Sequence, residues 1–205
     1  DLSKAWSMIA PHLDRLPLRL YPERKRQIFS PAVIPGIRAE KVLTESPDIV
    51  HLFWMADGFF RPEMLKSIDK PLIWTMHDMW PFTGGCHYDD ECGRYRANCG
   101  NCPVLGSDKS IDLSRRLWRR KSEAWRALNL TVVATSHWMA ECARESSLFR
   151  DKRIEVIPNG FDVSKFKPLN KLDARFAFNL PANKNLVLFS SFSAIADPRK
   201  GFQHL

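Results

Sequence analysis

The stretch KPLIWTMHD, residues 70–78, decides the fold that this sequence predicts. A Pro precedes five residues that are apolar or β-branched, from Leu72 to Met76, and the run then ends abruptly at His77 and Asp78. Short runs of this kind are typical of buried strands in a parallel sheet. Polar residues directly after such a strand lie at the sheet edge where α/β proteins bind ligands.

Other segments repeat this pattern along the chain. Further apolar runs occupy residues 49–54, 130–135, 154–157 and 185–189. Helical patterns lie at residues 2–13, 60–68, 111–128 and 136–146. Ser136 is placed to cap the last of these helices, which would leave free N–H groups at the end of a strand. Alternating strands and helices predict an α/β fold with a Rossmann-like parallel sheet and right-handed crossovers.

A domain boundary is predicted near residue 165. Phe166-Lys167-Pro168 indicates a break, and a polar, Lys-rich stretch precedes the last apolar run. We expect residues 1–165 to form the later portion of one Rossmann-like domain, and residues 166–205 to form a crossover and the start of a second one. Only one strand, residues 185–189, and the start of a helix belong to that second part, and one strand cannot form a sheet.

The bulk composition is ordinary for a globular protein, with 44% hydrophobic and 26% charged residues. No stretch of about 18 apolar residues is present, so we expect no transmembrane helix. No secretory signal is visible, which predicts a cytoplasmic chain, and the missing initiator Met fits a fragment. The net charge of +8 favours anionic partners: nucleic acid, an anionic membrane face or a phosphorylated substrate.

The segment after the deciding strand, residues 77–85, is the first candidate site. His77 and Asp78 side by side suit an acid–base pair or hydrogen bonds to a hydroxylated substrate. Gly84 and Gly85 let the backbone approach a ligand closely. The alternative is that the His and the Asp only fix a turn.

Four of the five cysteines form a second candidate site in the loop at residues 86–102. They are Cys86, Cys92, Cys99 and Cys102. Four thiolates suit one tetrahedral zinc ion, which would order a long loop, and His87 is an alternative ligand. Reduced thiols, disulfides, an iron–sulfur cluster and a catalytic metal with an open position are the competing interpretations.

Two shorter motifs complete the candidates. Asn159-Gly160 follows the run at residues 154–157 and predicts a tight turn at the same sheet edge. Arg199-Lys200-Gly201 lies where a strand–loop–helix junction would suit a phosphate group, although a Lys-Gly pair is also common in surface turns.

Together these motifs resemble retaining GT-B glycosyltransferases of the large family 4 group. Asn159-Gly160-Phe161-Asp162, with Phe166-x-Pro168 behind it, resembles the segment that crosses between the two domains of such enzymes. The run from His77 to Pro103 resembles a branch found in bacterial polysaccharide biosynthesis, including colanic acid glycosyltransferases. Ser136-His137-Trp138 and Lys200-Gly201 resemble a helix-opening motif and the Lys-Gly of the donor-binding domain.

The resemblance implies a hexosyltransferase that moves a sugar from a nucleotide-sugar donor to a saccharide or lipid-linked acceptor, with retention of configuration. It implies that His77 and Asp78 are catalytic, and that Lys200, Gly201 and Arg199 bind the donor diphosphate. Residues of the cleft and acceptor side would be Trp80, Gly84, Gly85, Ser136, Asn159 and Gly160. No metal is needed for the chemistry, so a zinc ion on the four cysteines would be structural.

The chain also departs from the family. The family's N-terminal strand and Gly-rich loop are absent. Ser190-Ser191-Phe192-Ser193 stands where the family has an Arg at the end of the donor strand, and Arg199 would substitute for it only in part. The acidic Glu-x7-Glu segment of the family would lie downstream of Leu205. We therefore expect that residues 1–205 alone do not transfer sugar. A cytoplasmic location, with peripheral attachment to the inner membrane face through the basic surface, fits the resemblance.

The alternative from another class is a small zinc-knuckle module that binds nucleic acid. Its basic surface would come from the helical pattern at residues 111–128. The residues concerned are Arg115, Arg116, Arg119, Arg120 and Lys121. Because the cysteines lie inside an α/β pattern, we favour the enzyme and expect no nucleic-acid partner.

Overall fold

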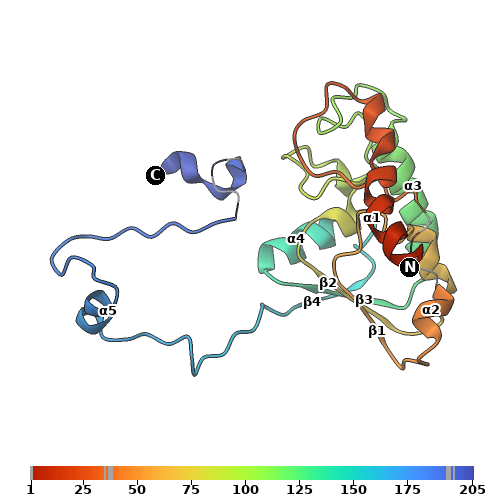
Figure 1. Cartoon of the computed structure of the whole chain (residues 1–205). Coiled ribbons are helices and arrows are strands. Elements are labelled where there is room, and N and C mark those ends of the chain that lie inside the picture. The colour runs from red at the N-terminus through yellow and green to blue at the C-terminus, as the bar shows by residue number, and fades with distance from the viewer. Residues whose placement is uncertain (1, 35, 37–38, 193–194, 196) are drawn as a thin grey trace. The chain divides into compact units, whose positions relative to one another are not determined.

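The backbone divides into two compact units, one ending at Asn159 and one beginning at Gly160. The structure is a computed structural model that describes residues 2–34, 36, 39–192, 195 and 197–205 (Figure 1). The predicted boundary between residues 165 and 166 lies inside the second unit.

A four-stranded parallel sheet forms the centre of the first unit, in the order β1-β2-β3-β4. The strands are β1 (Val50–Leu52), β2 (Leu72–Met76), β3 (Leu130–Ala134) and β4 (Arg153–Val156). One row of paired residues crosses the whole sheet, from Leu52 to Trp74, Val132 and Ile154. All four carboxyl ends therefore lie at one edge, and the predicted α/β, Rossmann-like arrangement is confirmed.

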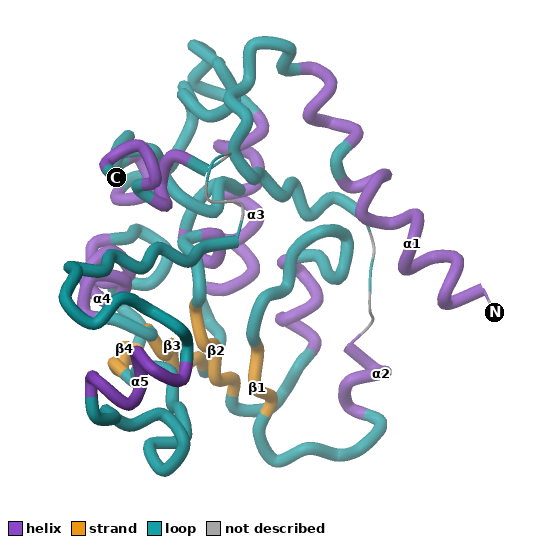
Figure 2. The backbone as a smooth tube through the Cα atoms, turned by 60° about the vertical axis from the view of Figure 1, so that its left-hand side comes forward, coloured by secondary structure: helices purple, strands orange, loops and turns teal. Residues whose placement is uncertain are grey.

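Within the first unit, α4 (His137–Glu145) packs against β3 and β4 of this sheet (Figure 2). The α-helices are α1 (Leu2–Asp14), α2 (Ala39–Leu43), α3 (Leu113–Trp125), α4 (His137–Glu145) and, in the second unit, α5 (Lys171–Ala177). Short 3-10 helices are η1 (Leu16–Leu20), η2 (Pro62–Ser67), η3 (Trp80–Phe82), η4 (Arg94–Arg96), η5 (Pro198–Lys200) and η6 (Phe202–His204). The helix predicted at residues 60–68 is thus a 3-10 helix, stabilised by i→i+3 bonds such as Ile68 N–H to the Leu65 carbonyl at 3.2 Å.

Side-chain caps determine where the two longest helices after β2 begin. Ser136 caps α4 as predicted, since its hydroxyl accepts from the Met139 N–H at 3.2 Å. Asp112 caps α3 by accepting from the Arg115 N–H at 3.0 Å. The same carboxylate accepts from the Cys102 N–H at 2.9 Å and so ties the cysteine loop to α3.

Aromatic side chains dominate the core. Trp74 of β2 and Trp125 of α3 meet edge to face with ring centroids 5.1 Å apart, and Trp80 and Phe149 pack around them. All four side chains are buried. Each indole N–H is satisfied; that of Trp80, for example, donates to the Ser30 carbonyl at 2.9 Å. Because these hydrogen bonds are made, the core buries large rings without orphaned polar atoms.

Lys121 of α3 is fully buried beneath this core. Its ammonium donates to the carbonyls of Trp80 and Thr83 and lies 3.6 Å from the centroid of the Trp80 ring. Burial lowers its pKa well below the ordinary value. Its neighbour Arg120 also points inward, to Glu63 at 2.6 Å. The basic helix face predicted for nucleic acid is therefore wrong at these two positions.

The second unit contains no strand among its described residues. The strand predicted at residues 185–189 is wrong: this segment is extended chain, and Val187 and Leu188 are 82% and 91% exposed. A strand needs the backbone of a neighbour to satisfy its N–H and C=O groups, and the described residues of this unit supply none. In the described part of the whole chain, no helix has the length and apolar character needed to cross a bilayer.

Replacement of Lys121 by Ala is expected to lower the free energy of unfolding by about 3 kcal/mol. The Trp80 and Thr83 carbonyls would lose their donor, and a cavity would open beneath two tryptophan rings. Urea denaturation followed by tryptophan fluorescence measures this change. Lys109→Ala, at an exposed position, is the control and should change stability by less than about 0.5 kcal/mol. Equal effects of the two substitutions would contradict the role of Lys121.

Candidate active site

The predicted residues His77, Ser136 and Asn159 lie at the carboxyl edge of the sheet, each following a different strand. Hydrogen bonds hold these strand ends together: the Thr135 hydroxyl donates to the Met76 carbonyl at 3.4 Å. Arg199, Lys200 and Gly201 belong to the second unit, as does Gly160.

His77 is the exposed titratable side chain at the end of β2. Its ring stacks on Phe53, which follows β1, with centroids 6.5 Å apart and an interplanar angle of 20°. It makes no hydrogen bond to another residue that the structure describes, so neither ring nitrogen is occupied within that part of the chain. A small cavity beside it is lined by the ends of β1 and β2, among them Phe53, Thr75, His77 and Asp78.

Asp78 is not the partner of His77. One of its oxygens accepts from the Trp80 N–H at 2.8 Å, and the other lies 2.7 Å from Nδ1 of His87. The catalytic role expected of His77 and Asp78 therefore stays a prediction, and the two side chains do not bond to each other. Asp78 instead holds the turn after β2 and accepts a hydrogen bond from His87, nine residues further along the chain.

His87 lies at the centre of a buried polar network. It is 4% exposed, and its Nε2 lies 2.9 Å from the hydroxyl of Ser30. With Nδ1–H donating to Asp78, Nε2 accepts from Ser30. Both nitrogens are engaged within the protein, so His87 has no nitrogen left for the metal for which it was considered as an alternative ligand. Although Ser–His–Asp connectivity also occurs in hydrolases, Ser30 is fully buried and cannot reach a substrate.

The network continues from Ser30 towards the N-terminal helices. Asp57, shortly after β1, lies 3.4 Å from the Ser30 hydroxyl and binds Arg15 at 2.5 Å. Sequence reasoning missed Asp57, Ser30 and Arg15. The available signal was the turn dipeptide Asp57-Gly58 behind a strand, where the Asp backbone is left-handed with φ of 55°.

Gly84 and Gly85 have packing roles that differ from the predicted approach to a ligand. Both are buried. A Cβ on Gly84 would lie 2.4 Å from the Ser114 carbonyl oxygen, and one on Gly85 would lie 2.5 Å from the Phe29 ring. Trp80, also expected in the cleft, is only 2% exposed. Gly84 and Gly85 thus let the loop pack closely against α3 and against Phe29 of the N-terminal segment. This packing supports the turn that carries His77.

The four clustered cysteines are free and line one small cavity. Backbone N–H groups point at three of the sulfurs: Arg94 at Cys92, Gly84 at Cys99 and Leu105 at Cys102. Burial raises the pKa of all four thiols, so they stay protonated unless a cation compensates the thiolates. Within the described residues no group of three or more potential ligands has metal-binding geometry, and the zinc site stays a prediction.

A parallel sheet that gathers polar groups at its carboxyl edge defines a ligand-binding α/β enzyme domain. The chain belongs to glycosyltransferase family 4, whose family model matches residues 3–165. It is also 32% identical over 125 residues to a protein of Escherichia coli (strain K12) named as the colanic acid biosynthesis glycosyl transferase WcaC.

This similarity covers 57% of the chain and 30% of the relative, so the chain spans less than a third of that protein. No solved structure gives a significant match. Family membership favours glycosyl transfer over the nucleic-acid-binding alternative.

His87→Ala is expected to lower the free energy of unfolding by about 2 kcal/mol, because the Ser30 hydroxyl and one oxygen of Asp78 would lose the bonds that they make to the ring. His77→Ala is the matched control and should change it by less than about 0.5 kcal/mol, since that ring is exposed and bonds to none of the residues that the structure describes. Chemical denaturation of the two variants measures the difference. A larger loss for the His77 variant would overturn this assignment.

A bound structural zinc would give one zinc ion per chain in elemental analysis of the purified protein. Cys99→Ser should then lose the metal. Cys142→Ser should keep it, because Cys142 is hydrogen-bonded to Tyr95 and does not line the cavity. Zinc-free native protein that releases five titratable thiols on unfolding would refute the site.

Proposed function

We propose that this chain is the acceptor-side part of an enzyme that transfers a hexosyl group from a nucleotide-sugar to a saccharide or lipid-linked acceptor. The reaction belongs to polysaccharide biosynthesis and retains the anomeric configuration. The observation that carries the proposal is the exposed, unbonded imidazole of His77 at the carboxyl edge of the sheet, in a chain of glycosyltransferase family 4.

His77 serves the reaction by hydrogen bonding to the transferred sugar. Its ring rests on Phe53, which restricts its orientation. Asp78 is a positioning residue, because its bonds to the Trp80 N–H and to His87 fix the turn from which His77 projects. A fixed donor or acceptor acts without reorganisation as charge develops on the sugar and the leaving group.

The helix α4 contributes its N-terminus to the same edge. Ser136 satisfies the Met139 N–H, while earlier N–H groups of the first turn stay open to an anionic group of the substrate. Asn159 extends this edge after β4. These groups suit the hydroxyl and phosphate oxygens of a nucleotide-sugar or its acceptor.

Lys200 supplies the positive charge for the donor diphosphate. Arg199 already holds Asp197 through two contacts of 2.7 and 2.9 Å, so its charge is largely matched. Gly201 has a left-handed backbone with φ of 73°, which favours glycine at the start of η6. The chemistry runs without a catalytic metal, and the enzyme works in the cytoplasm, held peripherally at the inner membrane face by its +8 charge.

The test uses the full-length gene product with a panel of UDP- and GDP-sugars and lipid-linked saccharide acceptors. We expect nucleoside diphosphate release coupled to a product with retained anomeric configuration, read by mass spectrometry and NMR. His77→Ala should lower kcat about 100-fold, the range of a lost general acid–base or polar contact at the reacting centre.

Lys109→Ala, distant from the sheet edge in sequence and exposed, is the activity control and should leave kcat unchanged. Absence of transfer from every donor, or a His77→Ala variant as active as the unmodified enzyme, would sink the proposal.

A further inference from the structure

Two adjacent aromatic side chains lie exposed where β1 ends. Phe53 is 49% exposed and Trp54 is 51% exposed. Together with His77 they line the small cavity at the ends of β1 and β2. Single exposed apolar residues are common on protein surfaces, but adjacent ones that line a cavity beside a polar group are typical of ligand sites. The position of the two rings therefore indicates contact with a ligand.

The backbone that carries these rings is anchored to the core. The Phe53 carbonyl accepts from the indole N–H of the buried Trp74 at 2.9 Å. Leu52, before the pair, and Met55, after it, are both buried. A backbone held on both sides presents the two side chains at fixed points, which lowers the entropic cost of binding a ligand there.

Each of the two rings is also held by a neighbouring ring. Phe53 stacks on His77 with centroids 6.5 Å apart. Trp54 lies against the buried His87, with centroids 6.1 Å apart and an interplanar angle of 40°. The His87 imidazole is bonded at both nitrogens, so the indole rests on a fixed neighbour. Trp54 thus offers a large, half-exposed ring whose orientation is restricted before any ligand binds.

The lining of the cavity suits a ligand that has an apolar face and polar edges. Both oxygens of Asp78 are engaged within the protein, and the Thr75 hydroxyl lies 2.9 Å from Nε2 of His51. His77, by contrast, bonds to no residue that the structure describes. A pyranose ring matches this combination, because the C–H groups of one face stack on an aromatic ring while its hydroxyls bond to an imidazole.

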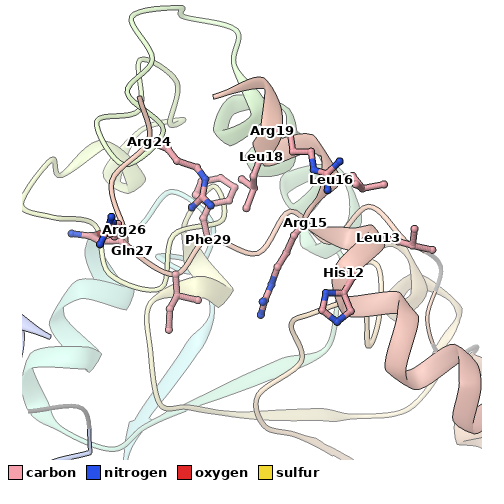
Figure 3. Close-up of a pocket in the computed structure, with 11 residues that line it drawn as sticks. His12, Leu13, Arg15, Leu16, Leu18, Arg19, Arg24, Arg26, Gln27 and Phe29 are labelled. Atoms are coloured by element: carbon pink, nitrogen blue, oxygen red, sulfur yellow. The ribbon is translucent and has the colours of Figure 1, made fainter. Parts of the chain in front are cut away.

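Charge separates this cavity from the larger pocket beside the N-terminal helices (Figure 3). Four arginines line that pocket: Arg15, Arg19, Arg24 and Arg26. A concave wall with one sign of charge concentrates ions of the opposite sign. A sugar ring without an anionic group gains nothing from such a field, and the aromatic rings beside His77 match it better.

We infer that Trp54, with Phe53 beside it, forms a stacking subsite for a pyranose ring of the substrate, next to the group that His77 contacts. This inference rests on the proposed function and adds the side chains that recognise the sugar. The ring belongs either to the transferred sugar of the donor or to the terminal sugar of the acceptor, and a kinetic experiment separates these sources. A nucleobase also stacks on aromatic rings, and a binding experiment tests for it.

Binding to the full-length protein is measured by saturation-transfer-difference NMR. The probes are the methyl glycosides of glucose, galactose and mannose, together with uridine. At least one glycoside should receive the strongest transfer at the C–H groups of one face. Absence of transfer to all three glycosides, or transfer to the uridine base alone, would overturn the inference.

The decisive variant is Trp54→Leu, which keeps an apolar side chain and removes the ring. It should weaken glycoside binding about tenfold, in line with the loss of one aromatic contact. Trp54→Phe, which restores a ring, should bind within about threefold of the unmodified protein. A Leu variant that binds as well as the Phe variant would show that no ring is needed and would refute the stacking.

Trp6→Leu is the matched control, because Trp6 is the same residue type, is 42% exposed on α1 and does not line this cavity. It should leave glycoside binding within about twofold. Thermal melting should show that both Leu variants fold, as expected for half-exposed side chains. Equal weakening by the two substitutions would contradict a specific contact at Trp54.

Steady-state kinetics of the full-length enzyme assigns the stacked ring to one substrate. Stacking contributes equally to the ground state and the transition state, so Trp54→Leu should raise the KM of one substrate about tenfold and change kcat by less than about twofold. A raised KM for the acceptor assigns the ring to the acceptor saccharide, and a raised KM for the nucleotide-sugar assigns it to the transferred sugar. Unchanged KM values for both substrates would overturn the inference.

The glycoside measurement needs neither donor nor turnover. Glycoside binding that ignores Trp54 would leave sugar transfer through His77 standing. Binding that depends on Trp54 without any sugar transfer would instead reject the proposed function and leave a sugar-binding site.

Discussion

The imidazole of His87, buried between Asp78 and Ser30, is the contact on which the arrangement of the candidate site depends. It joins the turn after β2 and the start of the cysteine loop to the N-terminal stretch, which lies 57 residues from His87 at Ser30. Backbone hydrogen bonds run alongside it, from the His87 N–H to the Ile28 carbonyl at 3.2 Å and from the Ser30 N–H to the Gly85 carbonyl at 2.9 Å. A ring with both nitrogens engaged fixes direction as well as distance, so these segments have one arrangement.

The buried ammonium of Lys121 reinforces the same region from the opposite side. It binds the carbonyls of Trp80 and Thr83, at the start and end of the short helical turn that follows Asp78. Burying a cation is unfavourable unless its donors are satisfied, and here carbonyl oxygens and two indole rings surround it. His87 and Lys121 thus hold the turn that carries His77, while the His77 ring bonds to no residue that the structure describes.

The strands were predictable because their signal is local. Residues 72–76 were expected and found as β2, and Ser136 was expected and found as a helix cap. Residues 185–189 carry the same apolar signal without a neighbouring strand and stay extended. The partner of Asp78 could not be read from its neighbours, since His87 reaches it only through the fold of the loop. Four arginines of the N-terminal region line one pocket: Arg15, Arg19, Arg24 and Arg26. Their spacing in the sequence follows no helix or strand period, so only the tertiary fold brings them together.

The carboxylate of Asp90 joins the N-terminal stretch to the cysteine loop. The side chains of Lys25 and Gln27 both bind it, and the Lys25 N–H donates to the Val104 carbonyl at 2.9 Å. Two positions of the N-terminal stretch thus depend on one acidic side chain. Loss of that single carboxylate would break both side-chain bonds at once, and only the backbone bond would then hold this part of the stretch against the loop.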